Sequence, residues 1–146
     1  MSKSNVFEGD ILQLIFLNTP IAGIGDAPGI LGSTVAGNLY WTLFTADPGE
    51  VGTAITNETA YTGYLRIAAP RSIVGFTVTG NSVSPPLNVD FGECTGSPGS
   101  PITHFGVVST ASGAGKLLYS GTMTPNITMA LTAIPRLKST STITED

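Results

Sequence analysis

From residue 39 onward the chain is a succession of short runs rich in β-branched and aromatic residues, separated by turn sequences that contain glycine or proline. Residues 39–46 form the clearest run, and the turn sequence Asp47-Pro48-Gly49-Glu50 follows it. A second signal is Gly80-Asn81, which lies between two such runs and is typical of a hairpin turn. This pattern predicts a mainly β fold, a jelly roll or β-sandwich of about seven to nine short strands. The further runs expected to form strands are 64–69, 76–79, 82–84, 88–91, 102–109, 116–121, 127–134 and 140–144.

Residues 5–17 have apolar side chains at helical spacing, at Phe7, Ile11, Leu14 and Ile15. Asn5, followed three residues later by Glu8, fits a capping pattern, and Pro20 stops the helix. Further apolar residues extend around most of this helix, so nearly all of its sides must be covered. We therefore expect an N-terminal helix that either lies across the chain's own core or docks on a partner.

The length of 146 residues suits one domain, since a chain of this size can bury roughly 70% of its unfolded surface. We predict a single domain over 1–146. Within it we expect a helical segment at 1–20, a Gly-rich loop at 21–38 and a β domain at 39–146. Loops as long as 21–38 are usually functional or mobile in a compact domain.

The surface must be unusually poor in charge. Charged residues make up 11% of the chain, against about 25% in an ordinary soluble domain. Mean hydropathy is +0.27, so Thr, Ser, Asn, Gly and small apolar residues must cover most of the surface. Such a neutral surface favours a non-enzymatic subunit that assembles with other chains. The alternative is a compact β protein that places Thr and Ser outside.

Several classes of protein are disfavoured by the composition. Six basic residues and a net charge of −4 leave no cationic cluster beyond Arg136 and Lys138, so we expect no nucleic-acid binding. No uncharged apolar run reaches the roughly 18 residues of a membrane span, and the first residues lack a signal-peptide pattern. Cys94 is the one cysteine, which excludes an intrachain disulfide framework and a Cys-based zinc site. These features predict a cytosolic product that is stable in reducing conditions.

No catalytic, cofactor-binding or metal site is predicted. Nucleophilic catalysis needs a nucleophile with a nearby base, yet His104 is the only histidine and no Gly-x-Ser-x-Gly motif occurs. The sequence Gly113-Ala114-Gly115-Lys116 fails as a phosphate loop, because Thr110 stands where that motif needs a glycine. We therefore predict that the protein is not an enzyme.

Two groups of carboxylates leave alternatives open. Asp47, Glu50 and Glu58 could meet around calcium, but their spacing matches no EF-hand loop, and we interpret them as solvated turn residues. A carbohydrate-acting enzyme on a jelly roll would need two carboxylates roughly 5–10 Å apart in a cleft. Asp90 and Glu93 are the nearest candidates for such a pair.

Residues 39–50 read Leu-Tyr-Trp-Thr-Leu-Phe-Thr-Ala-Asp-Pro-Gly-Glu. This stretch resembles the Leu-Tyr-x-x-Leu-[His/Phe]-Thr-Ala-Asp-Pro-Gly-Glu signature of a family of small tailed-bacteriophage structural proteins. Further similar segments follow in chain order: Asn57–Tyr64 with Arg66, Phe76–Asn81, Cys94–Gly96, His104–Gly106, Ala111–Gly121 and Thr144–Asp146. The departures are Phe44, where His is frequent, and Pro85-Pro86 in a stretch that is often Ala-rich.

Members of this family are commonly labelled tail fibre proteins, and their better-understood relatives resemble jelly-roll cement proteins outside HK97-type capsid shells. The resemblance implies a capsid cement or decoration protein of the virion, made in the host cytoplasm, which bridges and stabilises major capsid subunits on the outer shell. Its expected partners are the major capsid protein and copies of itself, as a homo-oligomer, dimer or trimer. The alternative is a tail fibre or tail-tip component involved in host attachment, which predicts trimers and an exposed sugar-binding loop.

Four apolar or aromatic side chains are our candidates for contact with a partner, because such residues dominate interface hot spots. They are Phe7, Ile11, Trp41 and Tyr61. Each of them could instead pack in the chain's own core.

Overall fold

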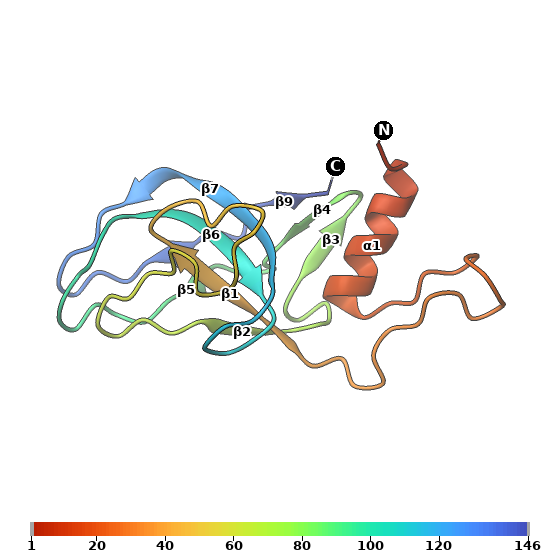
Figure 1. Cartoon of the computed structure of the whole chain (residues 1–146), viewed down its shortest axis with the longest axis horizontal. Helices are drawn as coiled ribbons and strands as arrows, with labels where there is room; N and C mark the ends of the chain where they lie inside the picture. Colours follow the sequence, from red (N-terminus) through yellow and green to blue (C-terminus); the bar gives the residue numbers. More distant parts are fainter. Residues whose placement is uncertain (1, 146) are drawn as a thin grey trace. The chain divides into compact units, whose positions relative to one another are not determined.

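The structure, a computed structural model, describes residues 2–145 and is mainly β, with 31% of residues in strands and 9% in a helix. This confirms the expected mainly β fold with an N-terminal helix, and the nine strands agree with the expected number. None of the described residues forms a helix long and apolar enough to cross a membrane. The elements labelled in Figure 1 are α1 (Asn5–Leu17), β1 (Asn38–Phe44), β2 (Ile67–Pro70), β3 (Thr77–Thr79), β4 (Ser82–Ser84), β5 (Val89–Asp90), β6 (Ile102–Val108), β7 (Leu117–Ile127), β8 (Arg136–Leu137) and β9 (Ile143–Thr144).

The strands form three sheets, with orders β2-β1-β6-β7, β3-β4-β9 and β5-β8. β6 pairs antiparallel with both β1 and β7, and β4 pairs antiparallel with both β3 and β9. Among the described strands, three hydrogen-bonded pairs are consecutive in the chain, namely β1 with β2, β3 with β4 and β6 with β7, and of these only β3 and β4 are joined by a two-residue turn. Long connections therefore bring most neighbouring strands together.

The chain divides into two compact units, which we call the helix unit and the sheet unit. The helix unit comprises Met1–Asn38, Ala69–Leu87 and Lys138–Asp146, and the sheet unit comprises Leu39–Ala68 and Asn88–Leu137. The first border between the units, after residue 38, coincides with the predicted end of the Gly-rich loop. The segments Ala69–Leu87 and Lys138–Asp146, which the sequence analysis placed in the β domain, belong to the helix unit. The interpretation of 1–146 as a single domain stays a prediction.

In the helix unit, α1 covers the predicted residues but has a different N-cap. Ser4 is the cap, with an extended backbone, and its hydroxyl accepts a hydrogen bond from the Phe7 amide at 3.4 Å. The predicted cap at Asn5 is therefore wrong by one residue. Because Phe7 and not Glu8 lies three residues after the true cap, no reciprocal capping box forms.

α1 packs on the β3–β4 hairpin through apolar side chains and one close backbone approach. Leu12 and Phe16 are fully buried, and the rings of Phe16 and Phe76 lie 4.8 Å apart between centroids. At Gly9 a Cβ atom would lie 2.9 Å from the carbonyl oxygen of Gly80. The glycine that weakens the helix interior is therefore the residue that lets the hairpin turn approach the helix.

The C-terminal end of α1 is closed by groups from outside the helix. Asn18 takes the left-handed conformation, with φ of 57°, and its amide donates to the Gln13 carbonyl. The guanidinium of Arg71 donates to the carbonyls of Leu14 and Ile15, both at 2.6 Å. These carbonyls belong to the last turn, where no intrahelical donor remains, and α1 has no basic residue of its own there.

The same arginine holds the Gly-rich loop. Its guanidinium donates to the Ala36 carbonyl at 3.1 Å, and its backbone amide donates to the Gly37 carbonyl at 3.1 Å. Nearer the helix, the Asn18 side chain exchanges two hydrogen bonds with the backbone of Ser33, at 2.8 and 2.7 Å. The 21–38 loop is thus tied to the end of α1 at both of these points.

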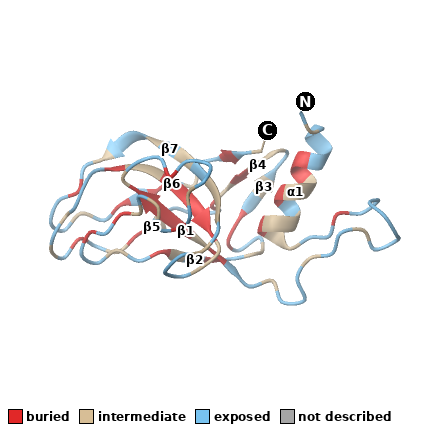
Figure 2. Ribbon diagram, viewed as in Figure 1, coloured by how far each residue is buried: buried red, intermediate tan, exposed pale blue. Residues whose placement is uncertain are grey.

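In the sheet unit, β1 and β6 are buried along most of their length, as Figure 2 shows in red. Trp41 pairs with Val107 in the antiparallel register. Strands buried on both faces need a cover on each face. The loop after β1 supplies one cover, because Ala54 packs with Phe44 and Val108 in a buried cluster.

One predicted strand does not form. β7 continues to Ile127, whereas the following residues of the predicted 127–134 strand lie outside any strand. The Cys94 amide donates to the Ala133 carbonyl at 2.9 Å, and the Thr132 amide donates to the Cys94 carbonyl at 2.8 Å. An apolar run cannot by itself distinguish a strand from a packed loop, and here two backbone hydrogen bonds to Cys94 hold the loop.

Candidate functional site

The turn after β1 begins a closed loop over residues 45–58. The Asp47 carboxylate accepts a hydrogen bond from the Gly49 amide at 2.9 Å, and Gly49 has a positive φ of 69°. This local turn follows from the Asp-Pro-Gly sequence. Asn57 closes the loop, because its side-chain amide donates to the Asp47 carbonyl at 2.8 Å and its carbonyl accepts from the Thr45 amide at 2.9 Å.

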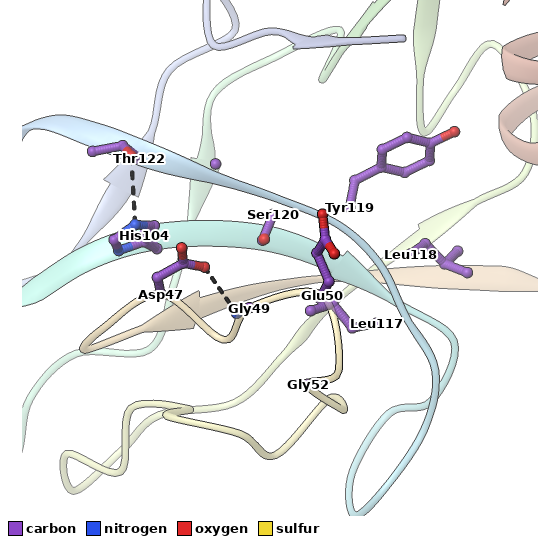
Figure 3. A pocket seen from close by; sticks show the side chains of 11 residues that line it. Asp47, Gly49, Glu50, Gly52, His104, Leu117, Leu118, Tyr119, Ser120 and Thr122 are labelled. Carbon is purple, nitrogen blue, oxygen red and sulfur yellow. Dashed lines mark hydrogen bonds between the residues drawn. The ribbon is translucent and has the colours of Figure 1, made fainter. Parts of the chain in front are cut away.

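A polar hollow of about 360 Å³ lies between this loop and the strands β6 and β7 (Figure 3). Its lining residues are Asp47, Gly49, Glu50, Gly52, His104, Leu117, Leu118, Tyr119, Ser120, Gly121 and Thr122. In Figure 3 the ring of Tyr119 points away from the loop, whereas Ser120 lies toward the carboxylates of Asp47 and Glu50. Carboxylates and hydroxyls without a lysine or arginine in this lining suit a neutral or cationic polar ligand better than an anion.

His104 is held in the wall of the hollow by two hydroxyl groups. Its Nδ1 lies 2.8 Å from the Thr103 hydroxyl, and its Nε2 lies 3.4 Å from the Thr122 hydroxyl. Thr122 is the β7 residue opposite His104 in the strand register. Both ring nitrogens therefore face hydroxyl groups of the chain itself, which fixes the orientation of the imidazole in the wall of the hollow.

A buried ion pair lies beneath the loop. Arg66, with a side chain 2% exposed, donates from Nε to Oε1 of Glu58 at 2.6 Å and from Nη2 to Oε2 at 2.7 Å. The Tyr64 hydroxyl donates to the same carboxylate at 3.0 Å, and the Thr42 hydroxyl donates at 3.2 Å. This carboxylate is therefore fully engaged, which makes the cluster structural.

The remaining donors of Arg66 join the 45–58 loop to the connection between β6 and β7. Nη1 donates to the Thr110 carbonyl at 2.9 Å, in the connection between β6 and β7. Nη2 donates to the carbonyls of Ala54 at 3.1 Å and Gly113 at 3.0 Å. One guanidinium thus fixes the 45–58 loop against the β6–β7 connection.

Several groups in the sheet unit have shifted pKa values. Hydrogen bonding to the Glu58 carboxylate raises the pKa of Arg66. Burial raises the pKa of Tyr64 above its usual range. Burial, with a smaller contribution from the charge of Cys94, raises the pKa of Tyr61 to about 12. These shifts extend to higher pH the range in which Arg66 is charged and both phenols are neutral.

The four predicted contact residues have different environments. Trp41 is 1% exposed and Tyr61 is 2% exposed, so both pack inside the chain. Phe7 is 36% exposed, and Ile11 is half-buried. Contact of these residues with a partner stays a prediction, and Phe7 is the most accessible of the four.

The carboxylates considered at the sequence level do not gather into one site. Asp47 and Glu50 line the hollow, whereas Glu58 is paired with Arg66. Within residues 2–145, no group of three or more His, Cys, Asp and Glu side chains could hold a metal ion.

The Asp90 carboxylate accepts two hydrogen bonds from Arg136, one of them at 2.7 Å. This guanidinium lowers the pKa of Asp90, whereas a general acid in glycoside hydrolysis needs a raised pKa. Asp90 therefore lacks the electrostatic environment of such an acid.

The sequence analysis considered Asp47, Glu50 and His104 but assigned none of them to a site, and it did not predict that they lie close together. It missed Ser120 and Thr122, which the β6–β7 register places opposite Gly106 and His104. The alternation of side chains along β7 indicates that Ser120 and Thr122 share one face. Placing that face at the hollow also required the identity of the partner strand and its register. Several segments that carry the family resemblance meet at this hollow.

The sequence model of the family described as "Podophage GP4 fiber I protein gp80" matches residues 30–144. The chain belongs to this family of tailed-phage structural proteins. No curated protein matches the chain.

Proposed function

We propose that the protein is a tail-fibre or tail-tip component of the virion that takes part in host attachment. The polar hollow in the sheet unit is the observation that carries this proposal, because it is a preformed site on the described surface. The description of the family, which names a fiber protein, supports it. The family also supports a place in the virion.

The chemistry of the hollow suits a hydroxyl-rich ligand such as a neutral saccharide. The exposed Glu50 carboxylate can accept hydrogen bonds from neighbouring sugar hydroxyls, while Ser120 and Thr122 can both donate and accept. The volume of about 360 Å³ lies within the roughly 300–1,000 Å³ of typical small-ligand sites.

Cryo-electron microscopy of the intact phage is the experiment that locates the protein. Density that fits this chain at the tail would support the proposal. Copies bridging capsid subunits across the outer shell would instead support the second function below. Absence of the chain from the particle would contradict both.

Binding of neutral oligosaccharides to the purified chain, followed by NMR chemical-shift changes, tests the hollow itself. We expect shifts around Glu50 and Ser120, and Glu50→Gln should weaken binding because it removes the charged acceptor. Glu93→Gln is the matched control, since Glu93 is exposed and does not line the hollow. Equal effects of both substitutions would place the ligand elsewhere.

A capsid cement or decoration protein is the second candidate, with the major capsid protein as its partner. The observation that favours it is a set of large apolar side chains in the helix unit, each at least 74% exposed. They are Val6, Val35, Ile73, Val74 and Leu87. Burying such side chains against a shell would be favourable, and many copies would multiply modest contacts into a stable lattice.

A further inference from the structure

The edges of the three sheets differ greatly in length. The edge strands β3, β9, β5 and β8 have two or three residues each, and β2 has four residues and ends at Pro70. Short strands and prolines limit the pairing of an edge with another chain. β7, by contrast, has 11 residues and is the last strand of the four-stranded sheet. It is the one long edge among the described strands.

β7 also lacks the other protections of an edge strand. Its sequence, Leu-Leu-Tyr-Ser-Gly-Thr-Met-Thr-Pro-Asn-Ile, contains no charged residue. None of its residues is fully buried, and Ser120, Thr122 and Thr124 are exposed. Pro125 interrupts the donors near one end, which leaves Leu117–Thr124 as the stretch able to pair. A long, uncharged and accessible edge of this kind is a template for intermolecular pairing.

We propose that two copies of this chain associate by antiparallel pairing of β7 with β7, which joins their four-stranded sheets into one continuous sheet. When two copies pair around a two-fold axis, each residue of β7 in one copy faces a residue of β7 in the other copy. A strand with several charges of one sign would then place like charges opposite each other. β7 has no such charges. The opposite edge, β2, is too short to extend the array, so pairing stops at two copies.

Edge pairing is compatible with an open hollow. The pairing uses backbone amide and carbonyl groups in the plane of the sheet, whereas Ser120 and Thr122 present their side chains to the hollow on one face. The inference therefore goes beyond the proposed function and does not depend on whether the copies sit on the tail or on the shell.

Sedimentation and light scattering of the purified chain over a range of concentrations test this inference. We expect a dimer for the natural sequence and a monomer for the double variant Thr122→Lys with Thr124→Lys, because lysines on an edge strand oppose strand addition. Hydrogen exchange should show slower exchange of β7 amides in the dimer than in the variant. Circular dichroism and thermal unfolding verify that the variant is folded.

The matched control is Thr77→Lys with Thr79→Lys, which places two lysines at exposed alternate positions of the short edge strand β3. This control should remain a dimer. A natural chain that is monomeric at every concentration would overturn the inference. So would a dimer or trimer that persists in the folded β7 variant, or one that the control also dissociates.

Discussion

The two units each contain one arginine that ties separate segments together, but the arginines are satisfied differently. In the sheet unit Arg66 forms a two-point ion pair with Glu58 and donates its other hydrogen bonds to carbonyls. In the helix unit Arg71 donates to carbonyls and to one hydroxyl, and it has no carboxylate partner among the described residues. The pKa shifts follow this difference, since the Glu58 carboxylate raises the pKa of Arg66 and burial lowers that of Arg71.

This difference shows two ways to fix a loop in a chain that has few charges. The buried pair of Glu58 and Arg66 leaves no net charge in the interior, so it is costly to break from either side. The Arg71 cation is half-buried and interacts with the partial negative charge at the end of α1. Its carbonyl partners can turn to water when the guanidinium is removed. We therefore expect the sheet unit to depend more strongly on its arginine than the helix unit does.

The largest effect is expected for Arg66→Met, which keeps the aliphatic bulk and removes the charge. Glu58, with a side chain 16% exposed, would remain largely shielded from water without its cation, and we expect a loss of about 3–5 kcal/mol in the free energy of unfolding. Urea denaturation measures this loss. Arg136→Met is the control, because its ion pair with Asp90 is solvent-exposed and should matter little. Similar losses for both variants would mean that burial does not distinguish the two pairs.

A smaller loss is expected for Arg71→Met. Two carbonyls of the last turn of α1 would lose their donors, at a cost of about 1–3 kcal/mol. Hydrogen exchange of the α1 amides should accelerate together with the loss measured by denaturation. Arg71→Lys should recover part of the stability, since it retains the positive charge near the helix end. A loss as large as that of Arg66→Met would break the comparison.

Alkaline pH should act on the sheet unit, because all four tyrosines lie there. The pKa of Tyr61 is raised from 10.0 to about 12, so its contribution is complete below pH 10 and is lost as pH rises toward 12. The physical reason is that the unfolded phenol ionises first. Across this window the natural protein should lose on the order of 2 kcal/mol more than Tyr61→Phe does. Denaturation series at increasing pH measure the difference, and parallel curves would contradict the raised pKa.

Gly9→Ala is expected to have the smallest effect and tests the packing of the helix unit. Alanine is favoured over glycine in a helix by about 1 kcal/mol, but the new Cβ would lie 2.9 Å from the Gly80 carbonyl. We expect the required shift of the hairpin to outweigh the gain, with a net loss of about 1 kcal/mol. Gln13→Ala, at an exposed position of α1, should leave the stability nearly unchanged. A stabilised Gly9→Ala protein would mean that the hairpin moves freely.

The sequence predicted those elements whose signals are local. The helix at 5–17, the Gly80-Asn81 hairpin and the strands beginning near residues 39 and 102 all form as expected. One failure was a choice between two adjacent residues, and another occurred where a distant segment decided the outcome. The cap moved to Ser4 because Ser4 and Asn5 are both acceptable caps, and the strand expected at 127–134 became a loop because the backbone of Cys94 bonds to it.

The sequence predicted one local turn of the candidate site but no binding site there. The turn at Asp-Pro-Gly, before Glu50, could be predicted from the sequence, since these three residues favour a turn by their own conformational preferences. Its position over His104 and Ser120 could not be predicted, because it depends on the register of β6 and β7 and on the hydrogen bonds of Arg66 to distant carbonyls. For Trp41 and Tyr61 the sequence allowed either contact with a partner or packing in the chain's own core, and only the tertiary structure shows how far each side chain is buried.

By itself the sequence determined a charge-poor, mainly β chain with an N-terminal helix and the family to which it belongs. These properties depend on composition, on short-range periodicity and on motifs whose residues are adjacent in the chain. The tertiary structure decided that Glu58 pairs with Arg66, that the backbone of Gly80 packs closely against Gly9, and that β7 is an edge strand of its sheet. Such outcomes depend on segments far apart in the chain, whose pairing is set by long-range packing and not by local conformational preference.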